Sequence, residues 1–163
     1  MAERIKGLNI ERRFTAEARD PYEDIAWAQR ESRIVNPDGS VVFEMQDAEV
    51  PASWSQVATD IIVSKYFRKA GVPQVKDEGE PVLDPEGRPV LGSERSAKDV
   101  FNRLAETWRH WGETYGYFAS SADAQGFEDE IKYMLDHQMA APNSAQWFNT
   151  GLAHKYGICG NTQ

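Results

Sequence analysis

The sequence predicts a mainly α-helical protein with a small β-hairpin near its N-terminus. Three segments carry apolar residues at helical spacing between helix-capping and helix-ending residues, and two β-branched runs flank a turn-forming stretch. At 163 residues the chain is about one domain in size and can bury a core. We divide it into an N-terminal arm with the hairpin, residues 1–50, and a helical domain, residues 51–163.

The composition excludes several classes of protein. The formal net charge is −8, and the basic residues do not cluster as a nucleic-acid-binding surface requires, so we expect no nucleic acid partner. No apolar run approaches the roughly 18 residues of a membrane span and no leader opens the chain, so we expect a cytoplasmic protein with no membrane partner. The single cysteine, Cys159, excludes an internal disulfide and a CxxC pair.

The arm and the hairpin occupy the first third of the chain. Residues 1–31 mix basic and acidic side chains without a sustained period, which is typical of an arm that packs against another part of the molecule. Short strands are predicted at residues 34–35 and 41–43, around a turn at residues 36–40 in which Gly39 supplies the positive φ.

The first predicted helix begins at Ser53, with Gln56 as the third residue inside it. Its apolar residues, which run from Trp54 to Ile62 at helical spacing, are expected to form core, and Gly71 ends the segment. Residues 72–92 are rich in proline, glycine and charge and indicate a loop.

Two longer helices follow. Ser96 and Asp99 open the second helix, whose aromatic face carries Trp108, Trp111 and Tyr115 before Gly116. The third helix begins at a cap on Ser120 or Ser121 and is expected to run through Met139 to Pro142.

Residues 141–151 are the strongest candidate for a binding site. Pro142 ends the preceding helix, Asn143 or Ser144 can cap the next one, and Gln146 is placed to complete a capping box. An ordinary helix cap is the commoner interpretation of this pattern. The alternative is a contact to a phosphate or a sugar hydroxyl, because a helix start favours anions and the Asn143 and Ser144 side chains add donors.

Other chemically active residues do not form recognisable sites. The three histidines, His110, His137 and His154, are far apart in sequence and lack metal-ligand spacing, and no glycine-rich phosphate loop occurs. The acidic residues 128–130 diverge around a helix and indicate a solvated face. Cys159 lacks the basic surroundings of a reactive thiol. We therefore assign no catalytic residue and no metal ligand.

Several motifs resemble one enzyme family over nearly the whole chain, from Asp20 onward. The most specific is residues 141–152, APNSAQWFNTGL, followed by Tyr156, Gly157 and Ile158. The other matching segments are residues 39–44, 50–51, 54–62, 65–73, 108–109 and 111–113. Together they resemble the N-terminal part of the long-form, adenosylcobalamin-dependent (class II) ribonucleoside-diphosphate reductases.

The resemblance implies a helical domain that precedes a ten-stranded α/β barrel, which is absent from this chain. In the family, a cysteine thiyl radical generated through adenosylcobalamin attacks the substrate ribose, and a cysteine pair supplies electrons. The resemblance also implies that Ser144 and Asn143 contact the ribonucleotide substrate, while the barrel binds most of the cofactor. Ala145 stands where the usual motif has proline, which loosens the helix start.

Three hypotheses follow from these patterns. The first is the N-terminal part of a reductase that reduces ribonucleotides for DNA synthesis, inactive alone and completed by a barrel in cis or on a second chain. In that case Trp108, Trp111, Trp147 and Phe148 are expected to pack against the barrel. The second is a free-standing helical protein-interaction module without catalysis. The third is a chain interrupted beside a self-splicing insertion.

Overall fold

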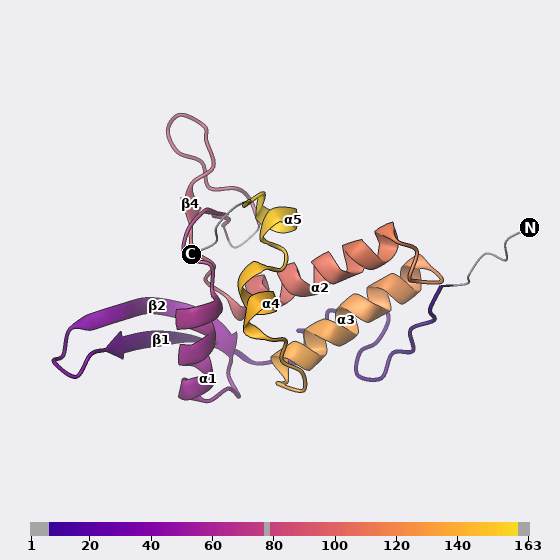
Figure 1. Ribbon diagram of the computed structural model, residues 1–163, viewed down its shortest axis with the longest axis horizontal. Helices are drawn as coiled ribbons and strands as arrows, with labels where there is room; N and C mark the ends of the chain where they lie inside the picture. Colours follow the sequence, from indigo (N-terminus) through magenta and orange to yellow (C-terminus); the bar gives the residue numbers. More distant parts are fainter. Residues whose placement is uncertain (1–6, 77–78, 160–163) are drawn as a thin grey trace, which may run out of the picture.

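The computed structural model describes residues 7–76 and 79–159 of the chain. Two long helices, α2 (Ala97–Thr114) and α3 (Ser121–Asp136), lie side by side at one end, and a β-hairpin with the short helix α1 (Gln56–Ile61) across it lies at the other (Figure 1). Helix α4 (Ser144–Asn149) contacts both α2 and the segment that follows α1. The expected combination of helices with a small β-hairpin is confirmed.

The hairpin pairs β1 (Trp27–Val35) with β2 (Val41–Pro51) in antiparallel register. The predicted turn at residues 36–40 is confirmed, with Gly39 at a φ of +85°. Both strands are longer than predicted, because they continue through polar residues such as Gln29 and Glu49 that hydrophobicity alone does not mark.

The N-cap of helix α1 (Gln56–Ile61) is Ser55, two residues later than the predicted cap Ser53. The Ser55 side chain accepts a hydrogen bond from the Ala58 N–H at 3.1 Å, so the prediction of Ser53 as the cap was wrong. The physical reason is a turn before the helix, in which the Trp54 N–H donates to the Pro51 carbonyl at 3.0 Å.

A π-helical turn, η1 (Ile62–Tyr66), follows α1 directly and changes which residues face the core. Ile62 and Val63 are buried, whereas Val57 and Ile61 are 69% and 44% exposed. The prediction that the whole apolar stripe is core was therefore wrong for Val57 and Ile61, whereas Trp54 and Ile62 do belong to the core. The segment also ends well before Gly71, because the backbone is already extended at Phe67.

The described residues of the predicted loop, 72–76 and 79–92, fold back on one another. The two ends of the loop pair as β3 (Val72–Pro73) and β4 (Leu91–Gly92), and bridges join Val75 to Pro81 and Leu83 to Pro89. This loop projects from the molecule beyond the helices (Figure 1).

Helix α2 (Ala97–Thr114) has the predicted capping box between Ser96 and Asp99. Val100 and Leu104 on its apolar face are buried, but Trp111, further along, is 47% exposed. The face is therefore core at its N-terminal end and surface at its C-terminal end.

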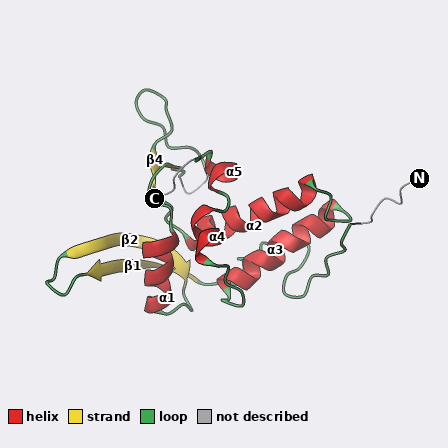
Figure 2. Ribbon diagram, viewed as in Figure 1, coloured by secondary structure: helices red, strands yellow, loops and turns green. Residues whose placement is uncertain are grey.

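Helix α3 (Ser121–Asp136) begins at the predicted cap, Ser120. It ends at Asp136, so the prediction that it continues to Pro142 was wrong. Gln138 has a φ of +55°, and the N–H groups of Met139 and Ala140 both donate to the Met134 carbonyl, which closes the helix early. The secondary structure of all these segments is shown in Figure 2.

Within the described residues, part of the predicted N-terminal arm packs along α3, whereas residues 1–6 of that prediction lie outside the described residues. The Ile10 N–H donates to Asp123 at 2.7 Å, and Arg12 forms an ion pair with Asp129 at 2.7 Å. The Thr15 N–H and hydroxyl donate to Glu130 at 2.9 and 2.6 Å. The acidic face of α3 thus binds a segment more than a hundred residues away in sequence.

The prediction that residues 128–130 form a solvated face was wrong, since all three acids are buried. Glu128 accepts from Lys132 at 2.6 Å and from Arg109 at 3.0 Å. Burial opposes ionisation of Glu128, but these two cations outweigh it and lower its pKa. Burial likewise opposes ionisation of Glu130, and the hydrogen bonds from Thr15 and its neighbours lower its pKa.

The core lies where β2, η1, α2 and α3 meet. Its members are Ala48, Val50, Trp54, Ile62, Val63, Phe67, Ala97, Val100, Phe101, Leu104, Leu135 and Trp147. None of the helices in the described part of the chain has the length and apolar character needed to cross a bilayer.

Candidate functional site

The candidate loop runs from the end of α3 through α4 into α5 (Leu152–Tyr156). Asn143 is the cap of α4, and its side chain accepts from the Gln146 N–H at 3.2 Å. The Gln146 side chain accepts from the Thr150 hydroxyl at 2.5 Å. In the predicted capping box, the Gln146 side chain would instead accept from the backbone N–H of Asn143. The loop is therefore closed at both ends of α4 by side-chain contacts.

Asn143 and Ser144 lie next to each other on the surface at the start of α4. The Ser144 hydroxyl lies 3.1 Å from the Tyr66 hydroxyl at the end of η1. Because a hydroxyl both donates and accepts, Ser144 can keep this contact and bind a second group. The structure thus places the two predicted binding residues together, in an accessible position.

Aromatic stacking holds the rest of α4 against the core. The Tyr66 ring stacks on Trp147 with a centroid distance of 5.6 Å and contacts Phe148 at 5.2 Å. Trp147 is only 8% exposed and also contacts Phe101 at 6.4 Å. Trp147 therefore belongs to this chain's own core.

An apolar groove of about 320 Å³ runs beside the loop. Its walls come from α1 and η1 on one side and from residues 140–142 and Trp147 on the other. Its lining includes Trp54, Ile61, Ile62, Tyr66, Leu135 and Pro142.

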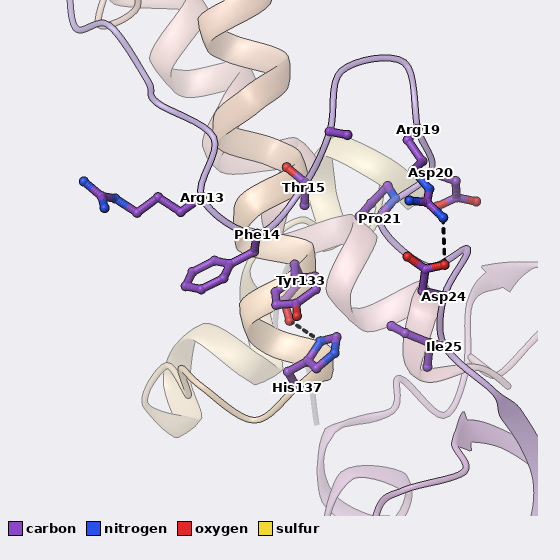
Figure 3. A pocket seen from close by; sticks show the side chains of 11 residues that line it. Arg13, Phe14, Thr15, Arg19, Asp20, Pro21, Asp24, Ile25, Tyr133 and His137 are labelled. Carbon is purple, nitrogen blue, oxygen red and sulfur yellow. Dashed lines mark hydrogen bonds and ion pairs between the residues drawn. The ribbon is translucent and has the colours of Figure 1, made fainter.

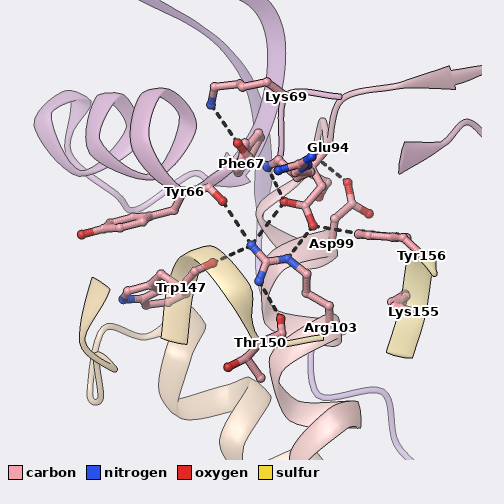
Figure 4. Close-up of polar contacts among 12 residues, drawn as sticks. Tyr66, Phe67, Lys69, Glu94, Asp99, Arg103, Trp147, Thr150, Lys155 and Tyr156 are labelled. Carbon is pink, nitrogen blue, oxygen red and sulfur yellow. Dashed lines mark hydrogen bonds and ion pairs between the residues drawn. The ribbon is translucent and has the colours of Figure 1, made fainter. Parts of the chain in front are cut away.

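A buried ion pair that sequence reasoning missed lies directly behind the loop. Arg103 on α2 and Glu94 are both fully buried, and the Arg103 Nε donates to Glu94 at 2.7 Å (Figure 4). The Tyr156 hydroxyl also donates to Glu94, at 3.0 Å. We call Arg103, Glu94 and Tyr156 the Arg103 cluster. One usable signal was the position of Arg103 three residues after the apolar Val100 on α2, which puts both side chains on one face of the helix.

The cluster perturbs the ionisation of Tyr156. Burial raises the pKa of Tyr156, and the negative charge of Glu94 raises it further. The hydroxyl therefore stays protonated and donates its hydrogen bond to Glu94.

The sequence spacing of the three histidines suggested that they lie apart, but two of them are in contact in the structure. The rings of His110 and His154 stack with a centroid distance of 4.3 Å, while His137 stacks on Tyr133 at 3.8 Å. Within the described residues, no group of three or more His, Cys, Asp or Glu side chains is arranged to hold a metal ion.

A second hollow, of about 310 Å³, lies between the N-terminal segment and the end of α3 (Figure 3). Phe14 stacks on Tyr133 at one edge, and Arg19 at the opposite side forms an ion pair with Asp24 at 2.7 Å. Arg13 points away from the hollow in Figure 3 and lies 3.5 Å from Glu11. The hollow therefore presents paired charges and no convergent set of binding groups.

Comparison with known proteins identifies the family. Residues 28–138 match the family described as class II vitamin B12-dependent ribonucleotide reductase, so the chain belongs to this family and corresponds to its N-terminal region. Among the relatives, the vitamin B12-dependent ribonucleotide reductase of Bradyrhizobium diazoefficiens is 49% identical over 96% of this chain. That of Agrobacterium fabrum is 48% identical over 96% of the chain, and that of Streptomyces avermitilis is 41% identical over 91%.

The chain spans about 14% of the length of each of these relatives. The match covers the hairpin, the loop at 72–92, α2 and α3.

Proposed function

We propose that this chain is the part of an adenosylcobalamin-dependent ribonucleotide reductase that presents a substrate-binding loop to the active site. The complete enzyme would reduce ribonucleotides to 2′-deoxyribonucleotides for DNA synthesis by radical chemistry. Membership of the family and the names of the relatives support this proposal. The expected compartment is the cytoplasm, where nucleotide substrates are available.

The cofactor is proposed to bind outside this chain. The groove beside the loop, at about 320 Å³, is at the lower end of the range for drug-sized ligands and too small for a corrinoid. The residues present therefore do not fit the cofactor, and we derive no step through it. A ten-stranded barrel, in cis or on a second chain, is proposed to supply the cofactor site and the reactive cysteines.

The observation that carries the proposal is the exposed position of Asn143 and Ser144 at the start of an anchored helix. The Gln146 N–H of the first turn is bonded to the Asn143 side chain, whereas the N–H groups of Ser144 and Ala145 have no carbonyl partner within the helix, and the Ser144 hydroxyl beside them adds a donor. Such an arrangement suits a phosphate or a ribose hydroxyl. Tyr66, which contacts Ser144, would hold its hydroxyl in place.

The Ser144→Ala variant of the complete reductase tests this role. Loss of a charge-assisted hydrogen bond should weaken the binding free energy of the ribonucleotide by on the order of 1.5 to 3 kcal/mol at most. The KM for the ribonucleotide should rise accordingly. Steady-state kinetics on ribonucleotides gives the value directly.

A matched control is Ser121→Ala, because Ser121 is the first residue of α3 just as Ser144 is the first residue of α4. Its KM should equal that of the unmodified enzyme. An unchanged KM in Ser144→Ala would reject the proposed contact.

The remainder of the reductase is the proposed partner of this chain's exposed apolar surface. Trp111 is 47% exposed, and Tyr115 and Tyr117 nearby are 69% and 59% exposed. The expectation that Trp147 packs against the barrel was wrong, because Trp147 is buried within this chain. Trp108 and Phe148 are partly buried and can contribute at the edge of such a contact.

A further inference from the structure

The Arg103 side chain contacts backbone carbonyls from two separate segments as well as Glu94. Its Nη2 donates to the Trp147 carbonyl at 2.7 Å and to the Tyr66 carbonyl at 3.1 Å, and its Nη1 donates to the Thr150 carbonyl at 2.8 Å. One guanidinium thereby joins α2, the end of η1 and the C-terminal end of α4 (Figure 4).

These contacts matter most for α4, because it is only six residues long. A helix of this length has little stability of its own and takes its orientation from its surroundings. The carbonyls of Trp147 and Thr150 lie at the end of α4 and lack helical partners, so a cation there satisfies them. The direction of α4 fixes where its other end, with Asn143 and Ser144, is presented.

Glu94 in turn fixes the direction of the guanidinium. Its carboxylate accepts from the Arg103 Nε at 2.7 Å, from the Tyr156 hydroxyl at 3.0 Å and from the Arg68 N–H at 2.7 Å. A fully buried ion pair is weak evidence for stability, since apolar residues of similar volume often hold a fold as well. The directional hydrogen bonds therefore point to a role in fixing geometry.

A backbone contact places the loop against the same turn of α2. Gly151 has a φ of +86°, and a Cβ at this position would lie 2.2 Å from the Arg103 carbonyl oxygen. The Arg103 residue thus meets the loop through its side chain and through its main chain.

From this geometry we infer that Arg103, held by Glu94 and Tyr156, is a positioning residue that sets the placement of Asn143 and Ser144 for substrate. The inference rests on the proposed substrate contact of that loop. Lysine cannot replace arginine here, because one ammonium group lacks the planar fork that reaches carbonyls from both segments and the Glu94 carboxylate together.

The test is steady-state kinetics on Arg103→Lys in the complete reductase, with thermal unfolding measured in parallel. Misplacement of the loop should raise the KM for the ribonucleotide about 5- to 50-fold, and more than it lowers kcat, because small displacements of positioned groups cost up to about 100-fold. Tyr156→Phe keeps the ring and removes one hydrogen bond, so it should fold normally and raise KM by about 2- to 5-fold.

Arg109→Lys is the matched control. Arg109 lies on the same helix and forms an ion pair at 3.0 Å with Glu113 within α2 and another at 3.0 Å with Glu128 on α3, and neither pair involves the loop. A merely structural role for Arg103 predicts that both lysine variants lower the melting temperature and leave KM unchanged.

The outcomes separate the inference from the proposed function. A raised KM in Ser144→Ala and in Arg103→Lys, but not in Arg109→Lys, supports both. A raised KM in Ser144→Ala alone, with Arg103→Lys and Tyr156→Phe at the unmodified value, overturns the positioning role and keeps the substrate contact. An unchanged KM in Ser144→Ala overturns the contact and the inference with it.

Discussion

At the scale of single residues, Asp136 is the most unusual ionisable group. Its side chain is fully buried at the end of α3, with one oxygen against His137 Nδ1 and the other without a hydrogen-bond partner among the described residues. Burial raises the pKa of Asp136 to about 7, although the adjacent His137 opposes the shift.

A raised pKa in the folded state means that the fold holds this proton more tightly than the unfolded chain does. The stabilisation that the protonated Asp136 carboxyl group contributes is therefore complete at pH values below the ordinary aspartate pKa of about 4. This stabilisation is lost as the pH rises through about 7, the pKa in the folded state. We predict that Asp136→Asn increases the free energy of unfolding at pH 8 by on the order of 1 to 3 kcal/mol.

The measurement is urea unfolding of the variant and the unmodified protein at pH 4 and pH 8. The two proteins should differ at pH 8 and converge at pH 4. A constant difference at both pH values would show that the ionisation of Asp136 is not linked to folding.

Single residues also show which features can be predicted from the sequence and which cannot. The positions of Asn143 and Ser144 followed from local rules, because a cap is defined by its nearest neighbours. The burial of Glu130 did not, since its partners are Phe14 and Thr15, far away in the sequence. A charged residue has no local pattern that reveals a distant partner.

At the scale of elements, the junction between α4 and α5 is the most constrained. Gly151 combines a positive φ with a close approach to the Arg103 backbone, whereas Gly157 has a positive φ of +68° and open space around it. We predict that Gly157→Ala costs about 1 to 2 kcal/mol of stability, the price of the left-handed conformation alone.

Gly151→Ala should cost more than Gly157→Ala by at least about 2 kcal/mol, because its Cβ also meets rigid backbone. Thermal unfolding of the two variants gives the difference. Equal losses would mean that the loop is not seated on α2 as the structure shows.

Helix starts were predicted better than helix ends. The caps at Ser96 and Ser120 are set by side chains next to the helix, and both predictions were confirmed. The early end of α3 and the π-helical turn η1 depend on how the chain packs, so periodicity did not reveal them. The Arg103 cluster was missed for the same reason, since Glu94 and Tyr156 lie on different segments.

At the scale of the whole molecule, we propose that the exposed aromatic surface at the end of α2 packs against the rest of the reductase. Trp111, Tyr115 and Tyr117 gather there, and Leu8 nearby is 64% exposed. We predict that the isolated chain binds an apolar fluorescent dye and that the complete reductase binds far less of it per molecule. Equal dye binding would contradict this partner surface.

We also predict that the chain alone does not catalyse ribonucleotide reduction. Cys159 is its one cysteine, whereas the proposed chemistry needs a cysteine pair as reductant. An assay of the purified chain with adenosylcobalamin, a ribonucleotide and a thiol should yield no deoxyribonucleotide. Formation of product would show that the site lies within this chain.

We propose above all that the loop at Asn143 and Ser144 contacts the substrate. The most direct measurement is the distance from the Ser144 Oγ to the nearest oxygen of a ribonucleotide bound to the complete reductase. We predict a hydrogen-bond distance of about 2.5–3.0 Å. A ribonucleotide bound in the active site with no atom within reach of Ser144 or Asn143 would contradict the claim.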